Sequence, residues 1–173
     1  MQSPIPALIV MGVSGCGKSS VGEAIARLGG GTLIEGDRYH PEANIAKMRA
    51  GIPLDDEDRA GWLQQLGEEL SRAVAGGKRP VLTCSALKRK YRDMLRSAVP
   101  GLGFVFLELS RDVAGDRVAQ RPGHFMPASL IDSQFATLEP PTGEPSTLVL
   151  DATVPVEALG LEAAQWWQAS GSN

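Results

Sequence analysis

The chain is poor in cysteine, since Cys16 and Cys84 are the only two among its 173 residues. Two cysteines exclude the disulfide framework that stabilises small secreted domains, and free thiols are typical of a reducing compartment. We therefore expect a cytoplasmic protein. At 18.3 kDa the chain is long enough to bury a core of its own, and we expect residues 1–173 to form a single domain.

Long apolar runs and an excess of one charge are also missing. No stretch approaches the roughly 20 residues that a membrane-spanning helix needs, and the start of the chain lacks the basic and apolar regions of a signal peptide. The 17 Lys and Arg against 20 Asp and Glu leave a net charge of -3. Because no strong positive field attracts a polyanion, we expect neither nucleic acid nor a membrane as a partner.

The chain does contain a glycine-rich run of the pattern G-x-x-x-x-G-K-[ST]. With the serine that follows, the run comprises Gly12, Val13, Ser14, Gly15, Cys16, Gly17, Lys18, Ser19 and Ser20. An apolar segment at 7–11 predicts a buried strand before it, and helical periodicity over 21–28 predicts a helix behind it. Backbone N–H groups at the glycines and at the helix N-terminus can wrap a phosphate chain. The run therefore predicts a nucleoside triphosphate site, with Lys18 on the β- and γ-phosphates and Ser19 on Mg²⁺.

Apolar strand candidates alternate with helical patterns along the chain. Strands are expected at 8–11, 32–35, 81–85, 104–109 and 147–150, and later helices near 55–76, 88–98, 127–138 and 156–167. The alternation predicts an α/β fold with three αβα layers and a parallel sheet of about five strands. Ligands of such sheets bind at the carboxyl ends of the strands, so residues just after each strand are site candidates.

Asp37 follows the second expected strand and suits phosphoryl transfer. It is placed to orient an acceptor hydroxyl and take its proton, or to hold Mg²⁺ through water. The alternative is an aspartate that only forms the turn after the strand. A switch-type GTPase would need the guanine-reading pattern N-K-x-D, which the sequence lacks.

Arg117 and Arg121 lie one helical turn apart, and Pro122-Gly123 then forces the chain out of the helix. A pair of arginines on such a segment is typical of a lid that closes over phosphates. We therefore expect a mobile lid near residues 117–127. The alternative is a solvated turn with incidental arginines.

Three longer blocks resemble the gluconokinases, small P-loop kinases related to the shikimate and nucleoside-monophosphate kinases. The blocks are 36–59, which begins Gly-Asp-x-x-His-Pro; 84–93, which contains Ser-Ala-Leu-Lys; and 123–139. The resemblance runs from about Leu8 to Asp151. It implies a P-loop kinase fold, transfer of the ATP γ-phosphate to the 6-hydroxyl of D-gluconate with Mg²⁺, and a homodimer.

The expected site combines the loop with residues of these blocks. Catalysis is expected from Lys18, Asp37, Arg117 and Arg121, and Mg²⁺ binding from Ser19 and Asp37. Gluconate needs a cation for its carboxylate and amide or imidazole groups for its hydroxyls. The matching residues are Asp37, His40, Asn44, Arg49, Arg59, Lys88, Arg89 and His124. Arg49 and Arg59 have the alternative of pairing with the carboxylates at 55–57, and Arg92 and Arg96 are expected on a solvated face.

Some questions stay open at this point. Glu35 stands where the family has Asp, which leaves a metal role undecided, and Cys16 stands where it has Ser. A helix N-terminus and Lys18 beside it predict that Cys16 is more reactive than Cys84, with an inert thiol as the alternative. Two other functions remain: another small-molecule kinase on this fold, or a nucleotide-gated module without turnover.

Overall fold

The central sheet has five parallel strands in the computed structural model, which describes residues 4–120 and 128–170. The strands are β1 (Leu8–Met11), β2 (Thr32–Glu35), β3 (Pro80–Thr83), β4 (Gly103–Glu108) and β5 (Thr147–Asp151). Their spatial order is β2-β3-β1-β4-β5, and every neighbouring pair is parallel. The expected strands are confirmed, although β3 and β4 begin and end one or two residues earlier than predicted.

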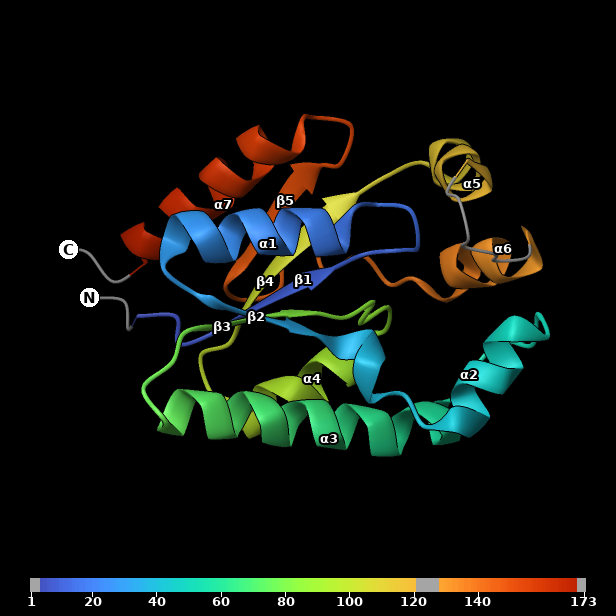
Figure 1. The fold of residues 1–173 in the computed structure, drawn as a ribbon, viewed down its shortest axis with the longest axis horizontal. Coiled ribbons are helices and arrows are strands. Elements are labelled where there is room, and N and C mark those ends of the chain that lie inside the picture. The colour runs from blue at the N-terminus through green and yellow to red at the C-terminus, as the bar shows by residue number, and fades with distance from the viewer. Residues whose placement is uncertain (1–3, 121–127, 171–173) are drawn as a thin grey trace.

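Helices cover both faces of the sheet and so make the three predicted layers (Figure 1). On one face lie α1 (Lys18–Gly29) and α7 (Val156–Ala169), and on the other lie α3 (Asp56–Ala75) and α4 (Arg89–Ala98). Beyond the carboxyl ends of the strands are α2 (Glu42–Arg49), α5 (Arg111–Ala119) and α6 (Ala128–Thr137). The ends of the described chain, near Ile5 and Ser170, lie side by side at the opposite end of the molecule (Figure 1).

The core is divided in two by the sheet. Because successive side chains of a strand point to opposite faces, Leu8 and Val10 of β1 join the cluster beneath α1 and α7. Ile9 and Met11 join the cluster on the α3 and α4 side. β1 is therefore buried on both faces, which explains its uninterrupted apolar sequence.

Local sequence signals set the helix positions. Asp55 caps α3: its side chain accepts from the backbone N–H of Asp58 at 2.7 Å, and the Asp58 carboxylate accepts from that of Asp55 at 3.0 Å. This capping box places the first turn of α3 beside α2. On the other face α7 lies close to α1, since a Cβ at Gly160 would come within 2.5 Å of Ala24. Trp167 of α7 is buried and donates to the Ile5 carbonyl.

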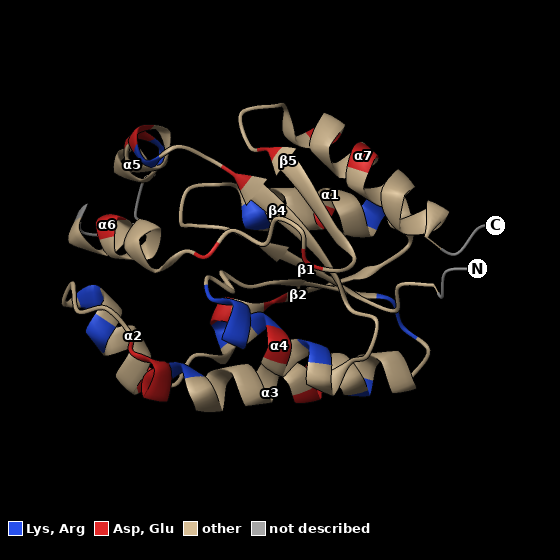
Figure 2. Cartoon of the chain, turned by 180° about the vertical axis from the view of Figure 1, so that it is seen from behind, with Lys and Arg blue, Asp and Glu red and all other residues tan. Residues whose placement is uncertain are grey.

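Charges of both signs are interspersed on α3, α4 and α5 (Figure 2). Among the described residues, none of the helices has the length and apolar character needed to span a membrane.

Candidate active site

The glycine-rich loop joins β1 to α1, and the side chain of Lys18 folds back onto the loop backbone. The Lys18 ammonium donates to the carbonyl oxygens of Gly12 and Val13, at 3.0 and 3.2 Å. Gly12 has φ +147°, and a Cβ there would lie 2.7 Å from the Cys16 sulfur. Only glycine fits this position without displacing the loop. Because α1 begins at Lys18, directly after the loop, the first N–H groups of the helix are next to the loop, as a phosphate-binding site requires.

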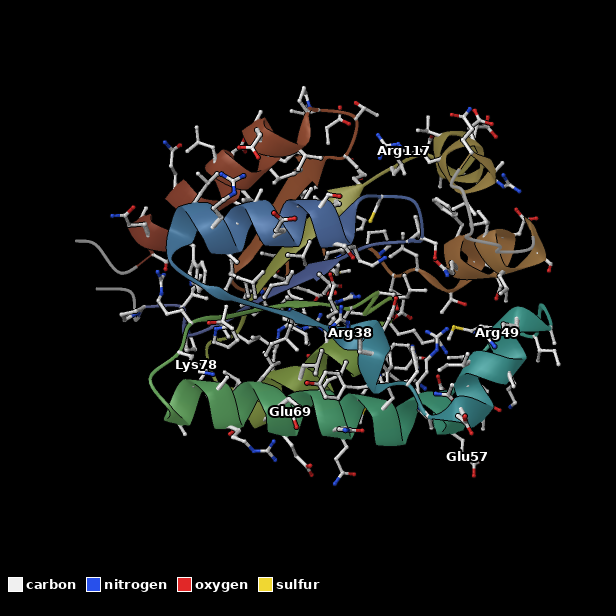
Figure 3. All side chains as sticks on the ribbon, in the orientation of Figure 1. Arg38, Arg49, Glu57, Glu69, Lys78 and Arg117 are labelled. Carbon is white, nitrogen blue, oxygen red and sulfur yellow. The ribbon has the colours of Figure 1, made fainter. Side chains whose placement is uncertain are left out.

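Two side chains from distant helices hold the loop from outside. Gln134 of α6 accepts from the Ser14 backbone N–H at 2.7 Å and donates to the Ser14 hydroxyl at 3.0 Å. Arg117 of α5 donates to the carbonyls of Gly15 and Ala152, at 3.1 and 3.0 Å, and lies between the loop and α5 (Figure 3). Gln134 was missed from the sequence, because its amide had nothing to distinguish it from other polar residues of its block.

Part of the predicted lid cannot be compared with the structure. Arg121 and His124 lie outside the described residues, and so does Pro127, the expected start of α6. Arg117 is described, and its two bonds are to backbone carbonyls at the edge of the phosphate loop.

Glu35 at the end of β2 lies against the start of α1. One of its carboxylate oxygens accepts from the Ser19 hydroxyl at 3.0 Å and from the Thr83 hydroxyl at 2.7 Å. Mg²⁺ prefers oxygen ligands and usually keeps waters and substrate phosphates beside one or two carboxylates. Within the described part of the chain, no group of three or more His, Cys, Asp or Glu side chains is suited to a metal. The donors present therefore fit Mg²⁺ bound together with a nucleotide, and not a closed protein cage.

A pocket opens beside the loop, between α2, α3, α6 and the end of β3. Its lining consists of Ser14, Lys18, Asp37, His40, Met48, Pro53, Leu54, Arg59, Trp62, Ser85, Leu130, Ser133 and Gln134. Five predicted site residues are thus brought together: Ser14 and Lys18 of the loop, with Asp37, His40 and Arg59. The pocket combines charged and hydroxyl groups with an apolar rim, which suits a small polar ligand.

The position of Asp37 is set by the glycine before it. A Cβ on Gly36 would lie 2.1 Å from the Thr83 carbonyl oxygen, so the chain passes β3 at a distance that only glycine allows. The Trp62 indole donates to the Gly36 carbonyl at 2.9 Å. Asp37 is the second residue of the 3₁₀ turn η1 (Gly36–Tyr39), and its side chain is 82% exposed.

His40 is held from two sides. Its ring stacks on Trp62 with centroids 3.9 Å apart. The Asn44 amide nitrogen lies 3.0 Å from the Asp58 carbonyl oxygen and 3.3 Å from His40 Nδ1. A carbonyl only accepts hydrogen bonds, so this Asn44 atom is the donor and Nδ1 of a neutral ring is its acceptor.

The remaining nitrogen of His40, Nε2, lies near Asp37, which also lines the pocket. Burial lowers the pKa of His40, an effect that Arg59 reinforces and the Asp37 carboxylate opposes. The neutral ring therefore carries its proton on Nε2, 3.7 Å from the Asp37 carboxylate. Asn44 itself is buried and does not line the pocket, so its amide supports His40.

Arg59 is the predicted gluconate-binding cation that lines the pocket, where it suits an anionic ligand. Its Nε is buried and has no hydrogen-bond partner among the described residues, and its guanidinium lies 5.3 Å from the Tyr91 ring centroid. Arg59 forms no salt bridge with the described residues. The alternative that it pairs with a carboxylate at 55–57 is therefore not supported. A buried donor without a partner is costly unless a ligand meets it.

Three other predicted cations do not line the pocket. Lys88 donates to Asp56 at 3.1 Å, and Asp56 also accepts from Lys90 and from Tyr91. These bonds, led by that of Lys90, lower the pKa of Asp56. The Arg89 backbone binds Glu139 and its side chain approaches Asp93. Arg49 lies at the end of α2 nearer to α6 (Figure 3).

The expectation that Arg92 and Arg96 lie on a solvated face is wrong. Arg92 is completely buried and the Arg96 side chain is 16% exposed, and both bind Glu144; helical spacing could not reveal a partner 48 to 52 residues away. Cys16 is 1% exposed, as is Cys84, which favours the alternative of an inert thiol, and the reactivity of Cys16 stays a prediction. Burial also raises the pKa of Cys84 to about 12.

A phosphate-binding loop that faces an acceptor pocket across the carboxyl edge of this sheet defines a P-loop kinase. The profile of a family described as "AAA domain" matches residues 8–141. A gluconokinase of Gluconobacter oxydans is 50% identical over 134 residues, covering 78% of this chain and 75% of that protein. The thermoresistant gluconokinase of Escherichia coli is 41% identical over 152 residues, 87% of each chain. The chain therefore belongs to the gluconokinase family.

The fold agrees with this relationship. The crystal structure of a gluconokinase from Sinorhizobium meliloti superposes with a TM-score of 0.88 at 48% identity, covering 98% of this chain and 96% of that one. A likeness of this extent includes the sheet, both helical layers and the elements around the pocket.

Proposed function

We propose that this protein is a gluconokinase, which transfers the γ-phosphate of ATP to the 6-hydroxyl of D-gluconate and so serves gluconate catabolism. The observation that carries the proposal is the pocket, in which Lys18 of the phosphate loop and Asp37 line the same space as His40 and Arg59. A linear polyol with one carboxylate needs this combination of a cation, an imidazole and hydroxyl groups.

The chemistry assigned to the chain is mostly positioning. The 6-hydroxyl loses its proton to Asp37 as its oxygen bonds to the γ-phosphorus. The bond from that phosphorus to the bridging oxygen breaks, and ADP leaves. Lys18 offsets charge on the transferring group. Ser19, Glu35 and Asp37 would hold Mg²⁺, which when bound supplies further positive charge to the phosphates.

Substrate recognition is proposed for the far side of the pocket. We assign the Arg59 guanidinium, which lines the pocket and forms no salt bridge with the described residues, to the gluconate carboxylate. His40, with its proton on Nε2, is assigned to a hydroxyl of the substrate and to Asp37. Three other predicted cations do not line the pocket. For these residues, Arg49, Lys88 and Arg89, we propose only a secondary role in binding gluconate.

The remaining expectations stand as proposals. Residues 1–173 form one kinase domain with a lid near 117–127, in which Arg121 and His124 complete the site when nucleotide binds. The enzyme acts in the cytoplasm as a homodimer. Two free, buried thiols support the cytoplasmic location, because free thiols are typical of a reducing compartment. Amide exchange at 117–127 with and without ATP tests the lid, and light scattering tests the dimer.

The activity is tested by coupling ADP release to a spectrophotometric assay. Gluconate, shikimate, AMP and CMP are compared as acceptors at equal concentration, each with ATP and Mg²⁺. We expect ADP release that depends on gluconate. Release with shikimate or a monophosphate would assign a different kinase, and nucleotide binding without turnover would assign a regulatory module.

A further inference from the structure

The Ser-Ala-Leu-Lys block contains a strained turn at the edge of the pocket. Ser85, half-buried, lines the pocket beside His40 and Arg59. The next residue, Ala86, has φ +47°, a left-handed conformation that L side chains other than Asn and Asp rarely adopt. Such a conformation persists only where the surroundings impose it.

Arg92 of α4 binds the carbonyl of this turn. Its Nη1 donates to the Ala86 carbonyl oxygen at 2.7 Å. The rest of the guanidinium is fully used: Nε and Nη2 bind the two oxygens of Glu144 at 2.9 and 2.6 Å, and Nη2 also binds the Glu139 carbonyl at 2.8 Å. A planar fork engaged at four bonds has one orientation, so the Ala86 carbonyl is held in one place.

Arg92 and Glu144 form an ion pair that is buried, which is rare for charged side chains. Arg92 is 0% exposed and Glu144 is 5% exposed at their side chains. Burial alone would raise the pKa of Glu144, but the bonds from Arg92 and Arg96 outweigh it and lower the pKa to about 2. Apolar residues of similar size often stabilise a fold as well as a buried ion pair does. Stability by itself therefore does not explain Arg92.

The turn that Arg92 holds is connected to both halves of the site. The Ser85 carbonyl accepts from the Gly12 N–H at 3.3 Å, at the start of the phosphate loop. The Leu87 carbonyl accepts from the Glu139 N–H at 2.7 Å, just after α6. A change in the turn would move Ser85 relative to the loop and to α6 together.

We propose that Ser85 contacts the hydroxyls of the polyhydroxy-acid substrate, and that Arg92 is its positioning residue, acting through the turn at Ala86. A serine hydroxyl both donates and accepts a hydrogen bond, which suits an alcohol chain beside the phosphate loop. The proposal rests on the proposed function, since it assigns a specificity contact within the same pocket.

The test uses Arg92→Lys, which keeps the charge and loses the fork, with Arg96→Lys as the matched control. Arg96 lies on the same helix and binds Glu144 at 2.8 Å, but its bonds do not include Ala86. We expect the KM for gluconate to rise about tenfold in Arg92→Lys and in Ser85→Ala, the effect of one lost hydrogen bond. Arg96→Lys lowers the melting temperature and leaves that KM unchanged.

The decisive variant is the double substitution Arg92→Lys with Ala86→Gly. Glycine adopts a positive φ without strain, so we expect it to restore the KM for gluconate in the Arg92→Lys background without restoring the melting temperature. A single Ala86→Gly variant serves as the baseline. If the double variant keeps the raised KM, or if Arg92→Lys has the wild-type KM, Arg92 is a stabilising residue only.

Two further points keep the outcomes separate. Should Arg92→Lys fail to fold, Glu144→Gln with and without Ala86→Gly is measured in the same way. It removes the paired carboxylate bonds of Nε and Nη2, so the guanidinium no longer has one orientation at the Ala86 carbonyl. We expect the same rise in the KM for gluconate and the same restoration by glycine, and a wild-type KM would overturn the positioning role. A wild-type KM in Ser85→Ala overturns the substrate contact. Failure of the proposed function is seen earlier, as absence of gluconate-dependent ADP release by the unaltered protein.

Discussion

The two halves of the site are built in different ways. The phosphate-binding half is one continuous run, residues 12–20, in which backbone N–H groups and Lys18 do the work. The acceptor half is assembled from separate segments: the turn η1, α2, the first turns of α3, the end of β3 and α6. A continuous run carries its chemistry in its own pattern, whereas an assembled pocket depends on which side chains the fold brings together.

The phosphate half makes the larger prediction. Lys18→Ala removes the positive charge that offsets the transferring phosphoryl group, and we expect kcat to fall about 10²–10³-fold. The fold should remain, because the hydrogen bonds that Lys18 forms with the described residues are to carbonyls of its own loop. Circular dichroism and melting provide the control. Normal kcat in a folded Lys18→Ala protein would separate this loop from the reaction.

Asp37 lies where the two halves meet. Asp37→Asn can still hydrogen-bond a hydroxyl but cannot accept its proton, so we expect kcat to fall about 10²–10⁴-fold with a small change in the KM for gluconate. Steady-state kinetics at saturating ATP measure both constants. A raised KM with kcat preserved would make Asp37 a binding residue alone.

The acceptor half is tested by comparing two arginines. Arg59 lines the pocket with an unpartnered Nε, and Arg49 does not line it. We expect Arg59→Lys to raise the KM for gluconate about tenfold or more, since lysine lacks the planar fork that meets a carboxylate. Arg49→Lys serves as the matched control. An equal effect of both changes would contradict the assignment of the carboxylate to Arg59.

The smallest effect is expected at Cys16. The side chain is buried within the loop, so Cys16→Ser should keep kcat and both KM values within about twofold. For the same reason iodoacetamide should label Cys16 and Cys84 slowly in the folded protein. Mass spectrometry of the labelled peptides measures the rates. Fast labelling of Cys16 that ATP slows would restore the reactive thiol expected from the sequence.

The sequence was informative where neighbouring residues act together. The phosphate loop, the five strands and the position of α3 were all predicted, because each depends on a pattern within a few residues. Gly36 and Asp37 could also be placed, since the carboxyl end of a parallel strand is where such a fold binds its ligand.

Long-range partners were the part that patterns could not supply. Arg92 and Arg96 lie at helical spacing, which is typical of a solvated stripe, but in the fold both bind Glu144 on a distant segment and Arg92 is completely buried. Lys88 and Arg59 are both cations in the matching blocks. The fold gives Lys88 a partner in Asp56 and leaves Arg59 Nε without one.

By itself, then, the amino-acid sequence determined the class of fold and the phosphate half of the site, because backbone geometry and helix dipoles follow from short-range order. Tertiary structure alone decided which charged side chains are free to meet a substrate. A charge in a folded protein is paired or left available according to what packs against it. For this chain the partner lies 52 residues away for Arg92 and Glu144, and 130 residues away for Arg27 and Glu157.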